Sequence, residues 1–110
     1  MPALETLRRR TDFEALSRGG SARTTRLLVA RSLITDRPTA RIGLAIPASI
    51  GGAVQRNRVR RRLRVLLRAR TEQIGVGVDL LLIARPGVDD ASYAELGLAL
   101  DEVLRVVVRS

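Results

Sequence analysis

The sequence predicts an α+β fold, a two-layer sandwich in which three helices pack on a mixed, roughly four-stranded sheet. Two observations lead to this prediction. Short stretches rich in Leu, Val and Ile, or with apolar residues at alternate positions, are followed by stretches whose apolar residues recur every three or four positions. Glycine and proline clusters separate these stretches. The length of 110 residues, residues 1–110, corresponds to a single domain with one hydrophobic core.

The first half of the chain is predicted to contain one short helix and two strands. Thr11 or Asp12 can cap a helix, and Gly19-Gly20 would end it. Residues 24–34 are rich in Leu, Val and Ile and predict a strand. After a polar turn, residues 40–47 alternate apolar side chains at period two and predict a second strand.

The second half is predicted to contain two longer helices around a buried strand. A glycine-rich bend leads into a helix over residues 53–72, and residues 78–84 read as the strand. Ser92 and Glu95 have the spacing of a capping box, which marks the start of the last helix. One face of that helix carries Leu96, Leu100, Val103, Leu104 and Val107.

Positive charge is concentrated in one segment. The chain has 20 Lys+Arg, all of them arginine, against 11 Asp+Glu, for a net charge of +9. No acidic residue lies between Asp36 and Glu72, whereas this stretch holds Arg37, Arg41, Arg56, Arg58, Arg60, Arg61, Arg62, Arg64, Arg68 and Arg70. The rest of the chain is nearly neutral. Such a distribution favours a polyanionic partner, with nucleic acid ahead of a membrane surface.

On a helix, the arginines of residues 56–70 form two rows beside an apolar stripe. Arg60, Arg64 and Arg68 lie on one flank with Arg61 beside them, and Arg58 and Arg62 lie further round. The stripe consists of Val59, Leu63, Leu66 and Leu67, and we expect it to face the core. Like charges three or four positions apart destabilise a helix by ~0.2–0.5 kcal/mol per pair. A helix that is merely solvated would intersperse Glu, so we interpret this one as a phosphate-binding face. A membrane-surface helix is disfavoured because the stripe lacks Trp and Phe.

Missing residue types exclude several kinds of chemistry. The absence of Cys and His excludes thiolate nucleophiles, serine-type triads and most transition-metal sites. The acidic residues are scattered or lie in the distal half, away from the arginines, so we predict neither catalytic residues nor a metal site in this chain. The longest apolar run, Leu80 to Ala84, is too short to span a membrane, and a cytoplasmic location is expected.

The order of residues in the basic segment resembles a known signature. Residues 50–64 read Ile-Gly-Gly-Ala-Val-Gln-Arg-Asn-Arg-Val-Arg-Arg-Arg-Leu-Arg, which is similar to the signature of the bacterial ribonuclease P protein. Arg56-Asn57-Arg58 matches its Arg-Asn-Arg core, and Arg60, Arg61 and Arg64 match the basic positions that follow. Asp12-Phe13 ahead of Gly19, and Ile83-Ala84-Arg85 at the end of the third strand, extend the resemblance over nearly the whole chain.

The resemblance implies a function, a set of partners and a topology. The protein would be the non-catalytic subunit of an endoribonuclease whose RNA subunit carries the chemistry, with Mg²⁺ bound mainly by that RNA. It would bind the catalytic RNA and precursor tRNA, with no obligate protein partner. It would also contain a left-handed βαβ crossover through the arginine-rich helix. The implied RNA-binding residues are Arg56, Asn57, Arg58, Arg60, Arg61, Arg62, Arg64 and Arg68.

A second implied site is a cleft on the sheet face that receives the 5′ leader of precursor tRNA. To it we assign Phe13, Leu28, Arg31 and Arg85. The family commonly has aromatic residues at the positions of Ser17, Leu28 and Arg31, and here Phe13 and Tyr93 are the only aromatics of the chain. Ala48 and Ser49 replace two usual lysines, and Gly52 replaces a usual Asn.

Two other classes of protein share some of these features. A ribosomal protein or RNA chaperone has the size and the basic helix, but is not expected to share the order of residues in 50–64. A DNA-reading helix needs polar side chains of several kinds, whereas this helix offers mostly arginine.

Overall fold

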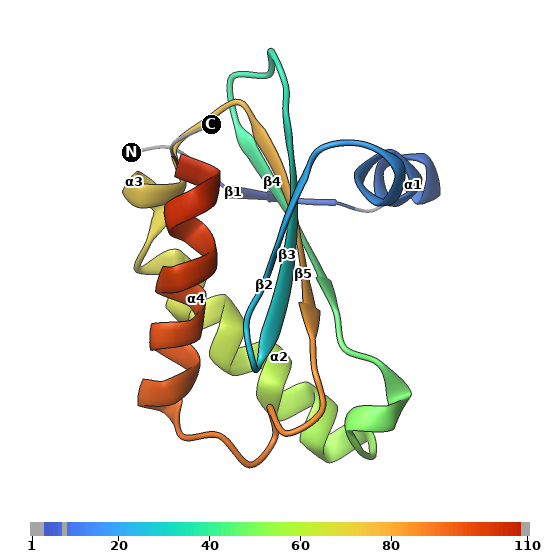
Figure 1. Cartoon of the computed structure of the whole chain (residues 1–110), viewed down its shortest axis with the longest axis vertical. Helices are drawn as coiled ribbons and strands as arrows, with labels where there is room; N and C mark the ends of the chain where they lie inside the picture. The colour runs from blue at the N-terminus through green and yellow to red at the C-terminus, as the bar shows by residue number, and fades with distance from the viewer. Residues whose placement is uncertain (1–3, 8, 109–110) are drawn as a thin grey trace.

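The computed structural model describes residues 4–7 and 9–108, which form one mixed sheet with helices on both of its faces (Figure 1). The strands are β1 (Leu4–Thr6), β2 (Ser21–Thr24), β3 (Leu28–Ile34), β4 (Ala40–Ala45) and β5 (Val78–Ala84). The helices are α1 (Arg10–Arg18), α2 (Ala53–Arg68), α3 (Thr71–Ile74) and α4 (Tyr93–Val108), with a 3₁₀ turn, η1 (Ala48–Ile50), ahead of α2.

The sheet has the strand order β1-β4-β5-β3-β2. β4 is parallel to both β1 and β5, whereas β3 is antiparallel to β5 and to β2. α2 connects the neighbouring parallel strands β4 and β5, so the predicted βαβ crossover through the arginine-rich helix is confirmed. Its left-handed sense stays a prediction.

The predicted α+β class is confirmed, with five strands in place of roughly four. The predicted strand over residues 24–34 corresponds to β3, which begins at Leu28. The sequence did not predict β2, which pairs antiparallel with β3 across a tight turn. In that turn the Thr25 hydroxyl accepts a hydrogen bond from the Leu28 backbone N–H at 3.1 Å. β1 was not predicted, because three residues are too few to show a period.

Two predicted helix ends are wrong. α1 begins at Arg10 without a side-chain cap, because Asp12 instead accepts hydrogen bonds from Arg41. The helix predicted over residues 53–72 ends at Arg68. In a continuing helix, the backbone N–H of Arg70 would donate to the Leu66 carbonyl. Here the Arg70 guanidinium donates to that carbonyl, at 2.9 Å. The Arg70 backbone N–H donates to the Leu67 carbonyl instead, at 2.9 Å.

The main core lies between the sheet and the helices α2, α3 and α4, which cover one face, while α1 covers part of the other (Figure 1). Leu80 and Leu82 of β5 are fully buried against this helical layer. Under α1, a smaller cluster joins Leu7, Leu16 and Leu81 with the half-buried Phe13. The sheet is therefore covered by a full helical layer on one face and by a partial one on the other.

The predicted capping box at the start of α4 is confirmed. The Ser92 backbone N–H donates to the Glu95 carboxylate at 2.9 Å, and the Glu95 backbone N–H donates to the Ser92 hydroxyl at 3.1 Å. These hydrogen bonds hold the pKa of Glu95 below its usual value. The predicted apolar stripe of α4 is buried from Leu96 to Leu104, and the side chain of Val107 lies outside the described residues.

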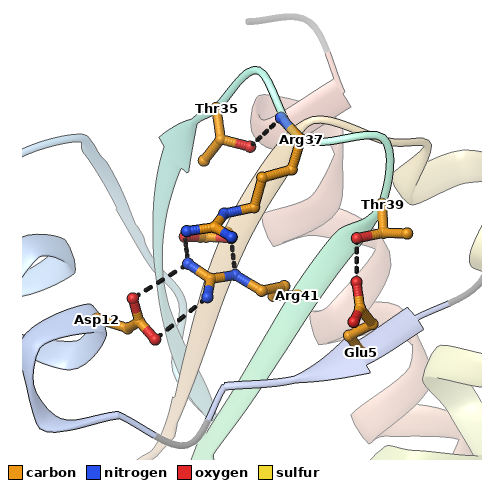
Figure 2. A network of polar contacts seen from close by, with 7 residues as sticks. Glu5, Asp12, Thr35, Arg37, Thr39 and Arg41 are labelled. Atoms are coloured by element: carbon orange, nitrogen blue, oxygen red, sulfur yellow. Dashed lines mark hydrogen bonds and ion pairs between the residues drawn. The ribbon is translucent and has the colours of Figure 1, made fainter.

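A buried ion cluster fastens α1 to the sheet. Arg41 of β4 donates to the Asp79 carboxylate of β5 at 2.9 and 2.5 Å and to the Asp12 carboxylate of α1 at two distances of 3.2 Å (Figure 2). All three side chains are largely buried: Arg41 is 14% exposed, Asp79 is 5% exposed and Asp12 is 16% exposed. Hydrogen bonding to Asp79 raises the pKa of Arg41, so its charge persists at any ordinary pH.

Replacing Arg41 with Met should lower the free energy of unfolding by about 3–5 kcal/mol, because two largely buried carboxylates would lose their cation. Urea unfolding of the free protein measures this loss. The control is Arg10→Met, which removes an ion pair whose arginine side chain is 92% exposed and which therefore contributes little. Equal losses in the two variants would contradict a structural role for the cluster.

Candidate nucleic-acid interface

The rotation of α2 about its axis is fixed by its apolar stripe. Val59, Leu63, Leu66 and Leu67 are buried, as the sequence predicts, and all four belong to the main core. The polar side of the helix therefore points away from the sheet. Because α2 is the connection between β4 and β5, this orientation follows directly from the crossover.

The predicted RNA-binding residues lie together on that polar side. Five of them are exposed: Asn57, Arg58, Arg61, Arg64 and Arg68. The other three are partly buried: Arg56, Arg60 and Arg62. We call the seven arginines of this set, from Arg56 to Arg68, the α2 arginines.

Within the part of the chain that the structure describes, no carboxylate forms an ion pair with any of the α2 arginines. The ion pairs there all involve other arginines: Arg10, Arg18, Arg23, Arg26, Arg41 and Arg70. The α2 arginines bind at most neutral oxygens. Arg58 donates to the Asp89 carbonyl at 3.3 Å, Arg62 to the Ala91 carbonyl at 3.2 Å, and Arg60 to the Asn57 side chain at 3.3 Å. Their charge is thus not neutralised within the described fold.

A shallow hollow of about 470 Å³ runs along the exposed side of the helix. Its lining consists of Val54, Asn57, Arg60, Arg61 and Arg64. An open hollow bounded by guanidinium groups can take phosphate oxygens, because each guanidinium presents several N–H donors in a planar fork. The hollow extends along α2 from Val54 to Arg64, and Asn57 is the residue of the Arg-Asn-Arg core that lines it.

Leu28 is wrongly assigned to the leader-binding set. Its side chain is fully buried in the main core under the helical layer. Arg31 follows Leu28 by three positions on β3. Successive residues of a strand face opposite sides of a sheet, so residues an odd number of positions apart lie on opposite faces. Leu28 and Arg31 therefore face opposite sides, and no leader on the Arg31 face can contact Leu28.

The other predicted leader-binding residues lie at separate places. Arg31 donates to the carbonyls of Leu16 and Ser17 at 2.7 and 2.9 Å, which holds the C-terminal end of α1 on the sheet. Arg85, just after β5, is half-buried and donates to the Thr25 carbonyl at 2.6 Å. Arg31 and Arg85 thus each bind backbone carbonyls of the protein, and their contact with a leader stays a prediction.

Phe13 instead lies near the α2 arginines. Its ring packs over Gly43 of β4 so closely that a Cβ at Gly43 would lie 2.9 Å from Cε1 of the ring. The ring also lines a groove that contains Arg60, Arg64 and Arg68. Sequence reasoning missed this juxtaposition, because it depends on where β1 and α1 lie beside β4.

Two further observations concern metals and membranes. The described residues contain no group of three or more His, Cys, Asp or Glu side chains placed to hold a metal ion. Among the helices described, none is long and apolar enough to cross a membrane.

Comparison with known proteins identifies relatives over nearly the whole chain. The family model for ribonuclease P matches residues 1–108. The ribonuclease P protein component of Desulforapulum autotrophicum is 34% identical, over 99% of this chain and 93% of that protein. The component of Streptomyces avermitilis is 39% identical, over 96% of this chain and 93% of that protein.

Solved structures share the fold. The Staphylococcus aureus RNase P protein matches with a TM-score of 0.85 at 22% identity, over 92% of this chain and 93% of that one. The Thermotoga maritima RNase P protein matches with a TM-score of 0.82 at 23% identity, over 92% of this chain and 96% of that one. Because the family model and these relatives span the basic helix and the sheet together, the chain belongs to the ribonuclease P protein component family.

Proposed function

We propose that this protein binds the catalytic RNA of ribonuclease P through the α2 arginines and the 5′ leader of precursor tRNA through the sheet face beside α1. The observation that carries the first part is the absence of any carboxylate ion pair along α2 in the described structure. Seven cations on one helix repel each other unless anions lie between them. RNA phosphates are anions at a regular spacing along a strand, and they suit planar guanidinium groups.

The roles of the side chains follow from their contacts. Arg61, Arg64 and Arg68 are exposed and donate no hydrogen bond within the described residues, so they are assigned to phosphate contacts. Arg58 and Arg62 are tied to the carbonyls of Asp89 and Ala91, so they also fix α2 to the segment before α4. For the leader we retain Arg85, because the ring of Phe13 lies in a groove beside the α2 arginines. Arg31 acts indirectly, by holding α1 in place.

Magnesium belongs to the same proposal. We assign the Mg²⁺ to the RNA subunit, because phosphate oxygens and water are ligands that Mg²⁺ prefers. Mg²⁺ bound by the RNA would supply water activation and charge neutralisation at the phosphodiester that is cleaved. The protein's part is to reduce repulsion between RNA strands and to hold the leader. A cytoplasmic location, with the precursor tRNA, completes the proposal.

Reconstitution tests this proposal. At low magnesium, the protein should increase cleavage of precursor tRNA by its cognate catalytic RNA, because it neutralises phosphates that magnesium would otherwise screen. The protein alone should produce no cleavage. Turnover by protein freed of all RNA, or a lack of stimulation at any magnesium concentration, would contradict the proposal.

The salt dependence of RNA binding tests the α2 arginines separately. In Arg61→Gln/Arg64→Gln/Arg68→Gln, the slope of log K against log salt for binding the catalytic RNA should fall by about 2–3 units, since each lost phosphate contact lowers it by somewhat less than ~1. Filter binding at a series of salt concentrations measures the slope.

The matched control loses the same charge elsewhere. Arg18→Gln/Arg23→Gln/Arg26→Gln removes three arginines that are paired with Glu14, Glu102 and Glu95. Its slope should stay close to that of the wild type. If both triple variants change the slope equally, binding depends on net charge and not on α2.

A further inference from the structure

A second hollow lies between α2 and the edge of the sheet where β1 ends. It is a groove of about 250 Å³ that shares Arg60 and Arg64 with the hollow on the exposed side of α2. These two arginines therefore form a ridge with one hollow on each side. β1 pairs with β4 only as far as Leu7, whose backbone N–H binds the Ile42 carbonyl, so the groove lies beside the part of β4 that β1 does not cover.

The two sides of the groove differ chemically. Its wall is apolar and contains one aromatic ring: Leu7, Phe13, Ile42, Leu44 and Leu67. Its rim on the helix side carries Arg60, Arg64 and Arg68. Glu5 and Thr6 of β1 form the opposite rim, where the Glu5 carboxylate accepts a hydrogen bond from the Thr39 hydroxyl. A ligand that fits must therefore have a flat or apolar part, which contacts the wall, and an anionic part, which contacts the arginines on the helix side.

We propose that this groove binds one unpaired nucleotide of an RNA strand, with its base against the apolar wall and its phosphate on Arg60, Arg64 and Arg68. The proposal rests on the function proposed above, because it takes the RNA backbone to follow the α2 arginines. A backbone that lies along the Arg60–Arg64 ridge has the groove directly beside it, so one base turned out of the strand can enter it.

The size and charge of the groove favour a single nucleotide. Sites for drug-sized ligands start at ~300 Å³, so a groove of about 250 Å³ suits one ring system and not a run of stacked bases. Arg64 and Arg68 are exposed and have no carboxylate partner in the described structure, so they can receive a phosphate. Every base has a π-face that can contact an aromatic ring, so the site does not require a particular sequence.

The direct test is a titration of the free, full-length protein with adenosine 5′-monophosphate, followed by ¹⁵N amide chemical shifts. Inorganic phosphate and ribose 5-phosphate at equal ionic strength are the comparison ligands. The nucleotide should give saturable shifts at Leu7, Ile42 and Leu44, because these residues line the groove that its base would enter. The two comparison ligands should shift amides of α2 only.

A blocked groove gives the test in the complex. Thr6→Trp places a large side chain on the rim from an exposed position of β1. Thr24→Trp is the matched control, because Thr24 is exposed on β2 at the opposite edge of the sheet. Thr6→Trp should weaken binding of the catalytic RNA by at least about fivefold, the lower end of what one base stack contributes. It should leave the salt slope unchanged.

The outcomes separate the two proposals. If the wild type does not bind the catalytic RNA, the proposed function fails. If the wild type binds but the nucleotide shifts only the amides that phosphate shifts, the groove is not a nucleotide site and this inference fails alone. It also fails if Thr6→Trp and Thr24→Trp bind the RNA equally well. The wild-type titration decides the question even if Thr6→Trp does not fold.

Discussion

The burial of four side chains of α2 against the sheet is the constraint on which the rest of the structure depends. Val59, Leu63, Leu66 and Leu67 can reach the core in only one rotation of the helix, and the chain must enter from β4 and leave to β5. That rotation directs the α2 arginines away from the sheet. No carboxylate of the described structure pairs with them, so the packing that stabilises the fold also leaves a row of cations for a partner.

Arginine has two different roles in this protein. On the sheet, Arg41 is held between Asp79 and Asp12, and Arg31 binds the last carbonyls of α1. These residues stabilise the position of α1, which in turn places Phe13 over Gly43 beside the groove. On α2 the same residue type is left without a carboxylate. The difference arises from the elements around each arginine, since the carboxylates that form ion pairs in the described structure lie on α1, β5 and α4 and bind arginines outside the α2 set.

The sequence was sufficient for features that depend on local pattern. The period of α2 predicted its buried stripe, and the spacing of Ser92 and Glu95 predicted the cap of α4. Features that depend on distant contacts were missed. Asp12 looked like a cap, but Arg41 of a strand far along the chain binds it. The groove beside Phe13 is formed by residues of β1, α1, β4 and α2. These elements are separated along the chain, so no local sequence pattern predicts that they come together.

The central claim is that the α2 arginines, which the fold leaves without carboxylate partners in the described structure, are the ones that contact the catalytic RNA. Arginine modification by phenylglyoxal, read by mass spectrometry with and without the catalytic RNA, tests it directly. Arg61, Arg64 and Arg68 should react in the free protein and become protected in the complex. The exposed Arg10 and Arg18, paired with Glu14, should react equally in both states. Protection of Arg10 and Arg18 with undiminished reaction along α2 would contradict the claim.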